Sequence, residues 1–307
     1  MSKAIVALGL PESGKTTFLA ALWHLLTNKK VLVRLSLVKL AAEEAAYLRE
    51  IATRWVQAKK QERTFHFGSK TVKLTLQSEG GEVFDLTFPD IAGEAFSQMW
   101  EMRECTPSVA DALRATGVLL FIHVDKIKPP GWIADDAALA EGMGDAPRDT
   151  QTDAQVAAEG AAPADGQANA QGEKAVPWKP ESSPSQVQLV DILRCLQTLP
   201  LEVGPRKLAV ILSAWDKVED DAVSPERFLE MHLPLLHQYL SHGLNAGWKQ
   251  RIFGVSAQGA EYDDVRSAPT ADADRMRDME VPSQRIKVVV GEVTSHDLTV
   301  PVDWLLE

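Results

Sequence analysis

Cysteine is scarce in this sequence: only Cys105 and Cys195 occur among its 307 residues. Both fall in apolar, helix-like segments, which predicts two buried free thiols of a reducing compartment and no disulfide framework. No apolar run approaches the roughly 18 residues that a membrane helix needs. The apolar run near the N-terminus is far too short for a signal peptide. These absences predict a cytoplasmic protein without membrane insertion.

Positive charge is also in deficit, with 32 Lys and Arg against 43 Asp and Glu and a net charge of −11. The sequence contains no run of Lys or Arg. A negative overall field repels polyanions, so nucleic acid and anionic membrane surfaces are excluded as the main partner. With 45% hydrophobic residues, the chain is long enough to bury one sizeable core.

The segment Gly9-Leu-Pro-Glu-Ser-Gly-Lys-Thr16 matches the pattern G-x-x-x-x-G-K-[ST]. An apolar run, residues 4–8, precedes it, and residues 17–26 follow with the apolar spacing of a helix. An ordinary glycine-rich turn is the alternative, but the strand–loop–helix placement favours a loop whose N–H groups surround a polyphosphate. Lys15 then reaches the β- and γ-phosphates, and the Thr16 hydroxyl binds Mg²⁺. The predicted nucleotide-binding residues here are Gly9, Glu12, Ser13, Gly14, Lys15, Thr16 and Thr17.

Strand and helix signals alternate along the chain, which predicts an α/β protein. We expect a single domain over 1–307 with the three-layer P-loop NTPase fold. It has a mostly parallel central sheet with one antiparallel hairpin strand and helices on both faces. Predicted strands are 71–76 and 83–88 as a hairpin, then 117–124, 207–212 and 251–255; residues 31–38 fit a strand or a loop. Predicted helices are 41–60, 95–115, 187–199, 225–241 and 300–306.

Residues 129–186 contain almost no large apolar side chains. Such a segment cannot bury enough apolar area to offset the entropy of ordering it, which predicts a disordered insertion. Trp132 and Trp178 near its ends either pin it to the domain or form a short partner-binding motif. Residues 261–284 are polar and acidic, and we expect a second loop there.

A second motif, Phe88-Pro-Asp-Ile-Ala-Gly-Glu94, follows the hairpin. Asp90 after a strand can hold Mg²⁺ through water, and Gly93 can bring its N–H to the γ-phosphate. Asp-x-x-Gly alone is equally typical of a turn. Its position after a strand, downstream of a phosphate loop, favours the nucleotide site.

With these two motifs the chain resembles the Ras-like (TRAFAC-type) P-loop GTPases. Their guanine-binding Asn-Lys-x-Asp corresponds to Ser213-Ala-Trp-Asp216, and their Ser-Ala-Lys corresponds to Ser256-Ala-Gln258. The resemblance implies that Asp216 accepts hydrogen bonds from guanine and that the Ala257 N–H bonds the guanine carbonyl. The resemblance also implies that Ser213 and Ser256 bind the nucleotide. Ala214 replaces the family's lysine, and we expect Trp215 or Lys217 to compensate for its loss. An ordinary strand-to-helix turn is the alternative for Ser213–Asp216.

The family's water-positioning glutamine corresponds to Glu94, whose charge disfavours a neighbouring γ-phosphate unless it is compensated. The resemblance therefore implies slow or partner-stimulated hydrolysis, with Lys15, Glu94 and Thr64 as catalytic candidates. Thr64 is also the candidate switch ligand of Mg²⁺ beside Thr16 and Asp90, with Thr71 behind it; a plain exposed threonine is the alternative. Arg63 is a candidate arginine finger or a solvated surface charge.

Within the family, Asp90–Glu94, Ser213–Asp216 and the terminal Pro301-Val-Asp-Trp-Leu305 look most like bacterial double-GTPase proteins of predicted conflict and defence systems. This likeness implies a GTP-hydrolysing molecular switch with Mg²⁺ and GTP or GDP as cofactors. It also implies a protein partner: an effector, an activator or a second GTPase. The alternatives are a non-hydrolysing nucleotide-binding scaffold and a P-loop ATPase. The oligomeric state stays open.

Overall fold

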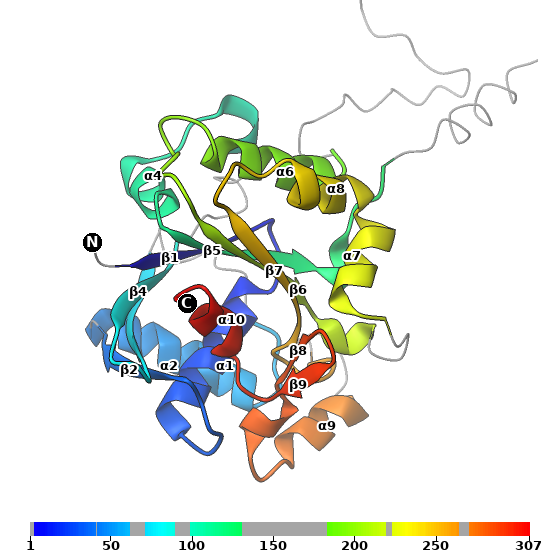
Figure 1. Ribbon diagram of the computed structural model, residues 1–307. Coiled ribbons are helices and arrows are strands. Elements are labelled where there is room, and N and C mark those ends of the chain that lie inside the picture. Colours follow the sequence, from blue (N-terminus) through cyan, green and yellow to red (C-terminus); the bar gives the residue numbers. More distant parts are fainter. Residues whose placement is uncertain are drawn as a thin grey trace, which may run out of the picture.

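The computed structural model describes residues 3–40, 42–61, 71–89, 99–130, 183–218, 223–263 and 270–307. At its centre lies a nine-stranded sheet with the order β2-β3-β4-β1-β5-β6-β7-β8-β9 (Figure 1). The strands are β1 Ala4–Gly9, β2 Leu35–Lys39, β3 Val72–Ser78, β4 Val83–Phe88, β5 Gly117–His123, β6 Lys207–Ser213, β7 Lys249–Ser256, β8 Lys287–Val290 and β9 Val293–Ser295.

The middle of the sheet is parallel. β4, β1, β5, β6 and β7 run side by side in the same direction. β3 pairs antiparallel with β4, as the predicted hairpin requires, and β2 extends that edge; β8 and β9 add antiparallel strands at the other edge. The central strands read as continuous apolar runs because both of their faces are covered.

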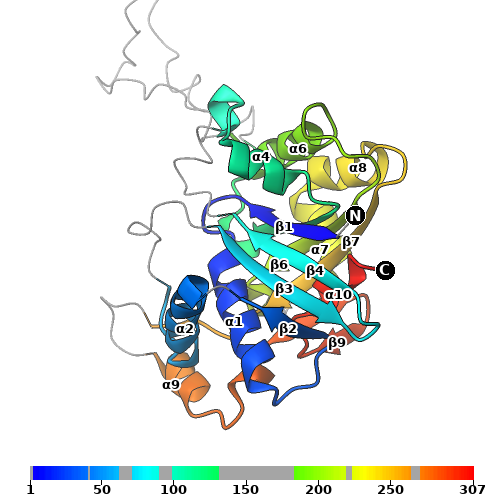
Figure 2. The same cartoon turned by 90° about the vertical axis from the view of Figure 1, so that its left-hand side faces the viewer.

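Alternation along the strands divides the core in two. In β1, Ile5 and Ala7 pack into one buried cluster, and Val6 and Leu8 pack into the other. The helices are α1 Lys15–Asn28, α2 Ala42–Val56, α4 Pro107–Leu113, α6 Ser185–Leu196, α7 Pro225–His232, α8 Pro234–His242, α9 Ala271–Arg277 and α10 Val300–Trp304. Helices α1, α2, α9 and α10 cover one face and α4, α6, α7 and α8 the other (Figures 1 and 2). This confirms the predicted three-layer α/β fold.

Two predicted helices are interrupted. The helix expected over 95–115 is broken, because Arg103 has a positive φ of 59° and α4 begins only after Thr106, whose hydroxyl accepts from the Val109 N–H. The helix expected over 225–241 is two helices that meet at Leu233 and Pro234. Proline disfavours helical backbone at the residue before it, and Leu233 has φ −134° and ψ 54°.

Two further expectations need correction, and one open alternative is decided. The polar stretch 261–284 is not a loop throughout, because it contains α9, which Thr270 caps through the Ala273 N–H. The cysteines are free as predicted but not buried: Cys105 is exposed, outside any helix, and Cys195 is half-buried on α6. The segment 31–38, which fitted a strand or a loop, contains both: residues 31–34 form no strand, and β2 begins at Leu35.

The chain leaves and re-enters the fold at one point around the predicted insertion. Lys128 and Ser185 exchange two hydrogen bonds, of 2.9 and 3.0 Å. Residues 131–182, which make up most of the predicted insertion, lie outside the described residues, so the insertion stays a prediction. In the described part of the chain, no helix has both the length and the apolar character to cross a membrane.

His24 on α1 makes stability depend on pH. Burial, and then the charge of Arg285, lower its pKa from 6.5 to about 4. The unfolded chain therefore takes up a proton near pH 6.5, whereas the folded protein takes it up only near pH 4. We expect the melting temperature to fall as the pH drops from about 6.5 to 4, and His24→Gln to remove part of that slope. If the melting temperatures of the two proteins fell by the same amount across this pH range, the assignment of the slope to His24 would be contradicted.

Candidate nucleotide-binding site

The predicted site lies at the carboxyl-terminal ends of the parallel strands, which together form one edge of the sheet. Because β1, β5, β6 and β7 are parallel, their carboxyl ends meet at the same edge. The register pairs Gly9 with Phe121 across β1 and β5, His123 with Ser213 across β5 and β6, and Ser213 with Val255 across β6 and β7. The connections that follow these strands carry the residues of the predicted motifs.

The phosphate loop, residues Gly9–Thr16, depends on its two glycines. Gly9 has φ +153°, and a Cβ there would lie 2.5 Å from the Phe121 carbonyl oxygen on β5. Gly14 has φ +88°, and its Cβ would lie 2.9 Å from Ser213 Oγ on β6. The loop can therefore pack this closely against the neighbouring strands only with glycine at both positions.

Lys15 folds back over this loop. Its ammonium donates to the carbonyl oxygens of Gly9 and Leu10 at 2.9 and 3.0 Å and to Ser13 Oγ at 3.0 Å. Helix α1 starts here with Gly14 as a cap that offers no side-chain hydrogen bond, and its first turn has no acidic residue. A cation and a helix N-terminus thus converge on one small concave loop, which is the arrangement that binds phosphate.

Ser213, at the end of β6, ties the phosphate loop to the next connection. Its buried hydroxyl donates to the Ser13 carbonyl oxygen at 2.8 Å. The bond spans 200 positions in the sequence and holds the loop in register with the turn that carries Asp216.

Asp216 is oriented by the third connection. Ser256 Oγ accepts from the Gly259 N–H at 3.0 Å and donates to Asp216 Oδ1 at 2.5 Å. A hydroxyl has one proton to donate, and here Asp216 Oδ1 accepts it. This bond fixes which of the two carboxylate oxygens faces Ser256. Among the described residues no hydrogen bond to Oδ2 is present, so that oxygen can accept from a ligand. Ala257, the other predicted base contact, directly follows Ser256.

Of the two residues expected to compensate for Ala214, Trp215 is buried and Lys217 pairs with an acidic neighbour. Trp215 is only 3% exposed, because its ring packs against Phe228 and under Gly254. Trp215 therefore does not compensate for the missing lysine, contrary to the expectation from the sequence. The Lys217 ammonium lies 2.6 Å from Asp125 Oδ2, and this hydrogen bond raises the pKa of Lys217 and lowers that of Asp125.

Several predicted site residues lie outside the described part of the chain: Arg63, Thr64, Asp90, Gly93 and Glu94. Their roles stay predictions. The end of β4, just before Asp90, is described. Phe88, the last residue of β4, has its ring 6.3 Å from that of Phe18 in α1. Because β4 is parallel to β1, the chain leaves β4 at the same edge as the phosphate loop. Thr71 is exposed just before β3.

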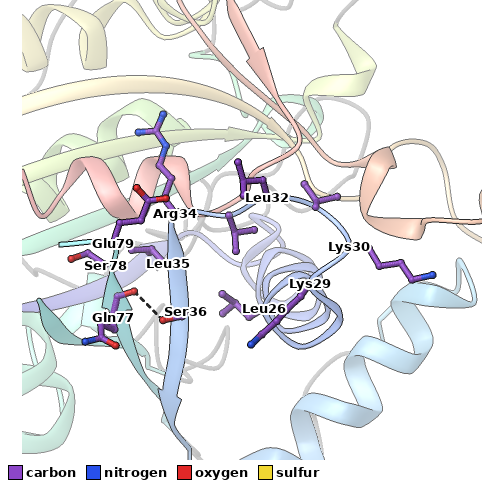
Figure 3. Close-up of a pocket in the computed structure, with 12 residues that line it drawn as sticks. Leu26, Lys29, Lys30, Leu32, Arg34, Leu35, Ser36, Gln77, Ser78 and Glu79 are labelled. Carbon is purple, nitrogen blue, oxygen red and sulfur yellow. Dashed lines mark hydrogen bonds between the residues drawn. The ribbon is translucent and has the colours of Figure 1, made fainter. Parts of the chain in front are cut away.

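A surface hollow of about 400 Å³ lies elsewhere (Figure 3). It is lined by Leu26 and Lys29–Ser36, together with Gln77–Glu79 of the β3 end. These residues surround the C-terminal end of α1, whereas the phosphate loop is at its N-terminal end. A 14-residue helix separates its ends by about 21 Å, so the hollow does not belong to the predicted site.

Sequence reasoning missed two residues that support the site. Asp125 carries the partner charge of Lys217. Trp55 on α2 donates its indole N–H to the Ala257 carbonyl oxygen at 2.8 Å. Asp125 had a weak signal, since an acidic residue two positions after a buried strand commonly faces a site at the sheet edge. Nothing local in the sequence signals the contact of Trp55 with a residue 202 positions away.

The fold and this edge of the sheet define a P-loop protein of the GTPase type. The model of the double-GTPase 1 family matches residues 6–305. The chain therefore belongs to the double-GTPase 1 family.

No curated protein is similar to this chain. Two solved structures of the Ski7 GTPase-like domain of S. cerevisiae resemble it distantly. The one bound to GTP has 14% identity and a TM-score of 0.41, over 90% of this chain and 49% of that one. The one bound to GDP and inorganic phosphate has 12% identity and a TM-score of 0.40, over 95% and 58%. This chain thus spans about half the length of those chains.

Proposed function

We propose that this protein binds GTP and hydrolyses it to GDP and phosphate with Mg²⁺, as a molecular switch. The observation that carries the proposal is the edge where Lys15 lies over the phosphate loop while Ser213 links that loop to the turn of Asp216. Phosphate binding and base selection are thereby built into one hydrogen-bonded unit. Membership of the double-GTPase 1 family supports the same nucleotide.

On binding, Lys15 exchanges its carbonyl partners for phosphate oxygens, and the α1 N–H groups face the same anion. Asp216 Oδ2 accepts from the guanine ring, which presents two neighbouring donors; adenine does not.

The donor chemistry fits Mg²⁺, which takes oxygen ligands and commonly combines one or two protein groups with phosphates. Thr16, in the first turn of α1, and Asp90 would hold the ion, with Thr64 as the switch ligand. The ion would neutralise charge on the β- and γ-phosphates. Glu94 stays the candidate for orienting water.

A non-hydrolysing nucleotide sensor is the second candidate. Glu94, a carboxylate at the position of the family's water-positioning glutamine, favours this candidate, because its charge disfavours a neighbouring γ-phosphate. The replacement of the family's lysine by Ala214 is the second departure that motivates it. A protein partner, either an activator or a second GTPase, is part of the same proposal, as are the cytoplasmic location and the conflict or defence setting.

Phosphate release distinguishes these candidates. We expect release from GTP in the presence of Mg²⁺, at a rate typical of unassisted switches of this type, on the order of 10⁻⁴ to 10⁻³ per second. Release should stop when EDTA removes the metal. Tight GTP binding without any release, with or without Mg²⁺, would favour the sensor, and equal release from ATP would favour the ATPase.

A further inference from the structure

The five residues Ser256–Ala260, here called the base loop, are held from behind by α2. We propose that Trp55 is a positioning residue for recognition of the base carbonyl, acting through the backbone of Ala257. The proposal rests on the proposed function and adds a residue that the guanine motifs do not contain.

The contact itself is fully enclosed. Trp55 is 0% exposed, and its Nε1 donates to the Ala257 carbonyl oxygen at 2.8 Å. Both groups are shielded from water, so neither has solvent as an alternative partner. A buried donor and acceptor in this situation strongly favour one geometry, because breaking the bond leaves two unsatisfied groups.

This bond restrains the base loop at a second point, in addition to the bond between Ser256 and Asp216. The Ser256 hydroxyl, bonded to Gly259 and Asp216, fixes the chain before the Ala257 N–H. Trp55 fixes the Ala257 carbonyl, on the other side of the Ala257 Cα. With both flanking groups held, the Ala257 N–H between them has little freedom to rotate, which is the preorganisation that selective hydrogen bonding to a ligand requires.

Trp55 is itself locked in place. The Arg285 guanidinium stacks on its ring at 3.7 Å and donates to the Trp55 carbonyl oxygen, and the His24 ring lies 5.0 Å from the indole. Arg285 also packs against the base loop directly. Gly259 has φ +90°, and a Cβ there would lie 2.8 Å from Arg285 Cβ. The tryptophan and the arginine thus form one rigid support beneath the loop.

The segment directly after α2 holds the chain beyond the base loop as well. The Lys60 N–H donates to the Asp263 carbonyl oxygen, and the Asp263 N–H donates to the Ala58 carbonyl oxygen, both at 3.0 Å. These bonds form a parallel bridge between Lys59 and Asp263. The base loop is therefore attached to α2 at Ala257 and, three residues after the loop ends, to the segment directly after α2, so Trp55 acts within a fixed frame.

The test is Trp55→Phe in the full chain, which removes the indole N–H but keeps an aromatic ring beneath Arg285. Trp304→Phe is the matched control, since Trp304 lies in the same core cluster and its ring faces Phe253 of β7 and not the base loop. Affinities for GTP, ITP and ATP are measured with Mg²⁺. GTP and ITP share the 6-carbonyl that the Ala257 N–H contacts, whereas ATP has an amino group there.

We expect Trp55→Phe to weaken GTP and ITP by about 5- to 10-fold, the net effect of one buried hydrogen bond. ATP affinity should change by less than about twofold, so the GTP-to-ATP ratio falls. Trp304→Phe should leave the ratio unchanged. An unaltered ratio in Trp55→Phe, with wild type preferring GTP, would overturn the role of Trp55 and leave the proposed function intact. If wild type itself shows no guanine preference, both proposals fail.

A measurement on wild type alone covers the case in which Trp55→Phe does not fold. Hydrogen exchange of the Trp55 indole N–H reports the opening of its bond to Ala257. The proposal expects exchange to slow on addition of GTP and not on addition of ATP. Equal slowing by both nucleotides, or none by GTP, would contradict it.

Discussion

Replacing Lys15 with alanine is expected to lower affinity for a nucleoside triphosphate by about 100-fold or more and to reduce phosphate release to background. The ammonium lies over the phosphate loop in contact with Gly9, Leu10 and Ser13. Its removal takes away the charge aimed at the β- and γ-phosphates, and charge-assisted bonds to phosphate are among the strongest in proteins. It also removes three hydrogen bonds within the loop. Titration with a fluorescent GTP analogue measures the first effect, and a phosphate assay the second.

The matched control is Lys30→Ala. Lys30 is exposed beyond the other end of α1, so this variant loses the same charge from the whole molecule but not from the loop. We expect it to bind and hydrolyse like wild type. If Lys15→Ala retained wild-type affinity, the loop would not be a phosphate site, and the nucleotide proposal would have to be abandoned.

Asp216→Asn is expected to lower GTP affinity by about 100-fold and to raise affinity for xanthosine triphosphate. Ser256 has one hydroxyl proton and donates it to Oδ1. The asparagine oxygen should take that position, which places the amide NH₂ where Oδ2 faces the ligand. An acceptor for the guanine amino group thereby becomes a donor, which repels that group and suits the 2-oxo group of xanthine. The magnitude follows from an unpaired polar group in a site built for hydrogen bonding.

Asp278→Asn makes the same change of charge at the exposed C-terminal end of α9 and should leave nucleotide selectivity unaltered. Both variants are titrated with GTP, XTP and ATP under identical conditions. Equal losses of GTP and XTP affinity in Asp216→Asn would mean that Asp216 supports the fold of the site without contacting the base.

Much of this architecture could be predicted because its signals are local. The buried strands β5 and β6 are nearly continuous apolar runs, and the β3–β4 hairpin alternates cleanly on either side of its Gly80-Gly81 turn. The glycines of the phosphate loop mark the two positions where the backbone approaches neighbouring strands. Parallel strand order then brings Ser213, Asp216 and Ser256 to one edge.

The remainder depends on contacts that the sequence does not signal locally. The strands β8 and β9 are 4 and 3 residues long, and β8 owes its place to pairing with β7. The isolated motif at Ser213–Asp216 gave no sign that Trp215 would turn inward, since that depends on the space beside Phe228 and Gly254. The link from Trp55 to Ala257 joins two elements far apart in the chain, so only the folded structure could reveal it.

The central claim is that this edge of the sheet selects guanine nucleotides. A titration of the wild-type protein with fluorescent GTP, GDP and ATP analogues, with Mg²⁺ present, tests it most directly. We expect saturable binding of GTP and GDP at concentrations at least tenfold below those needed for ATP. Equal binding of ATP and GTP would leave only a general phosphate loop and contradict the assigned role of Asp216; no binding of any nucleotide would contradict the account altogether.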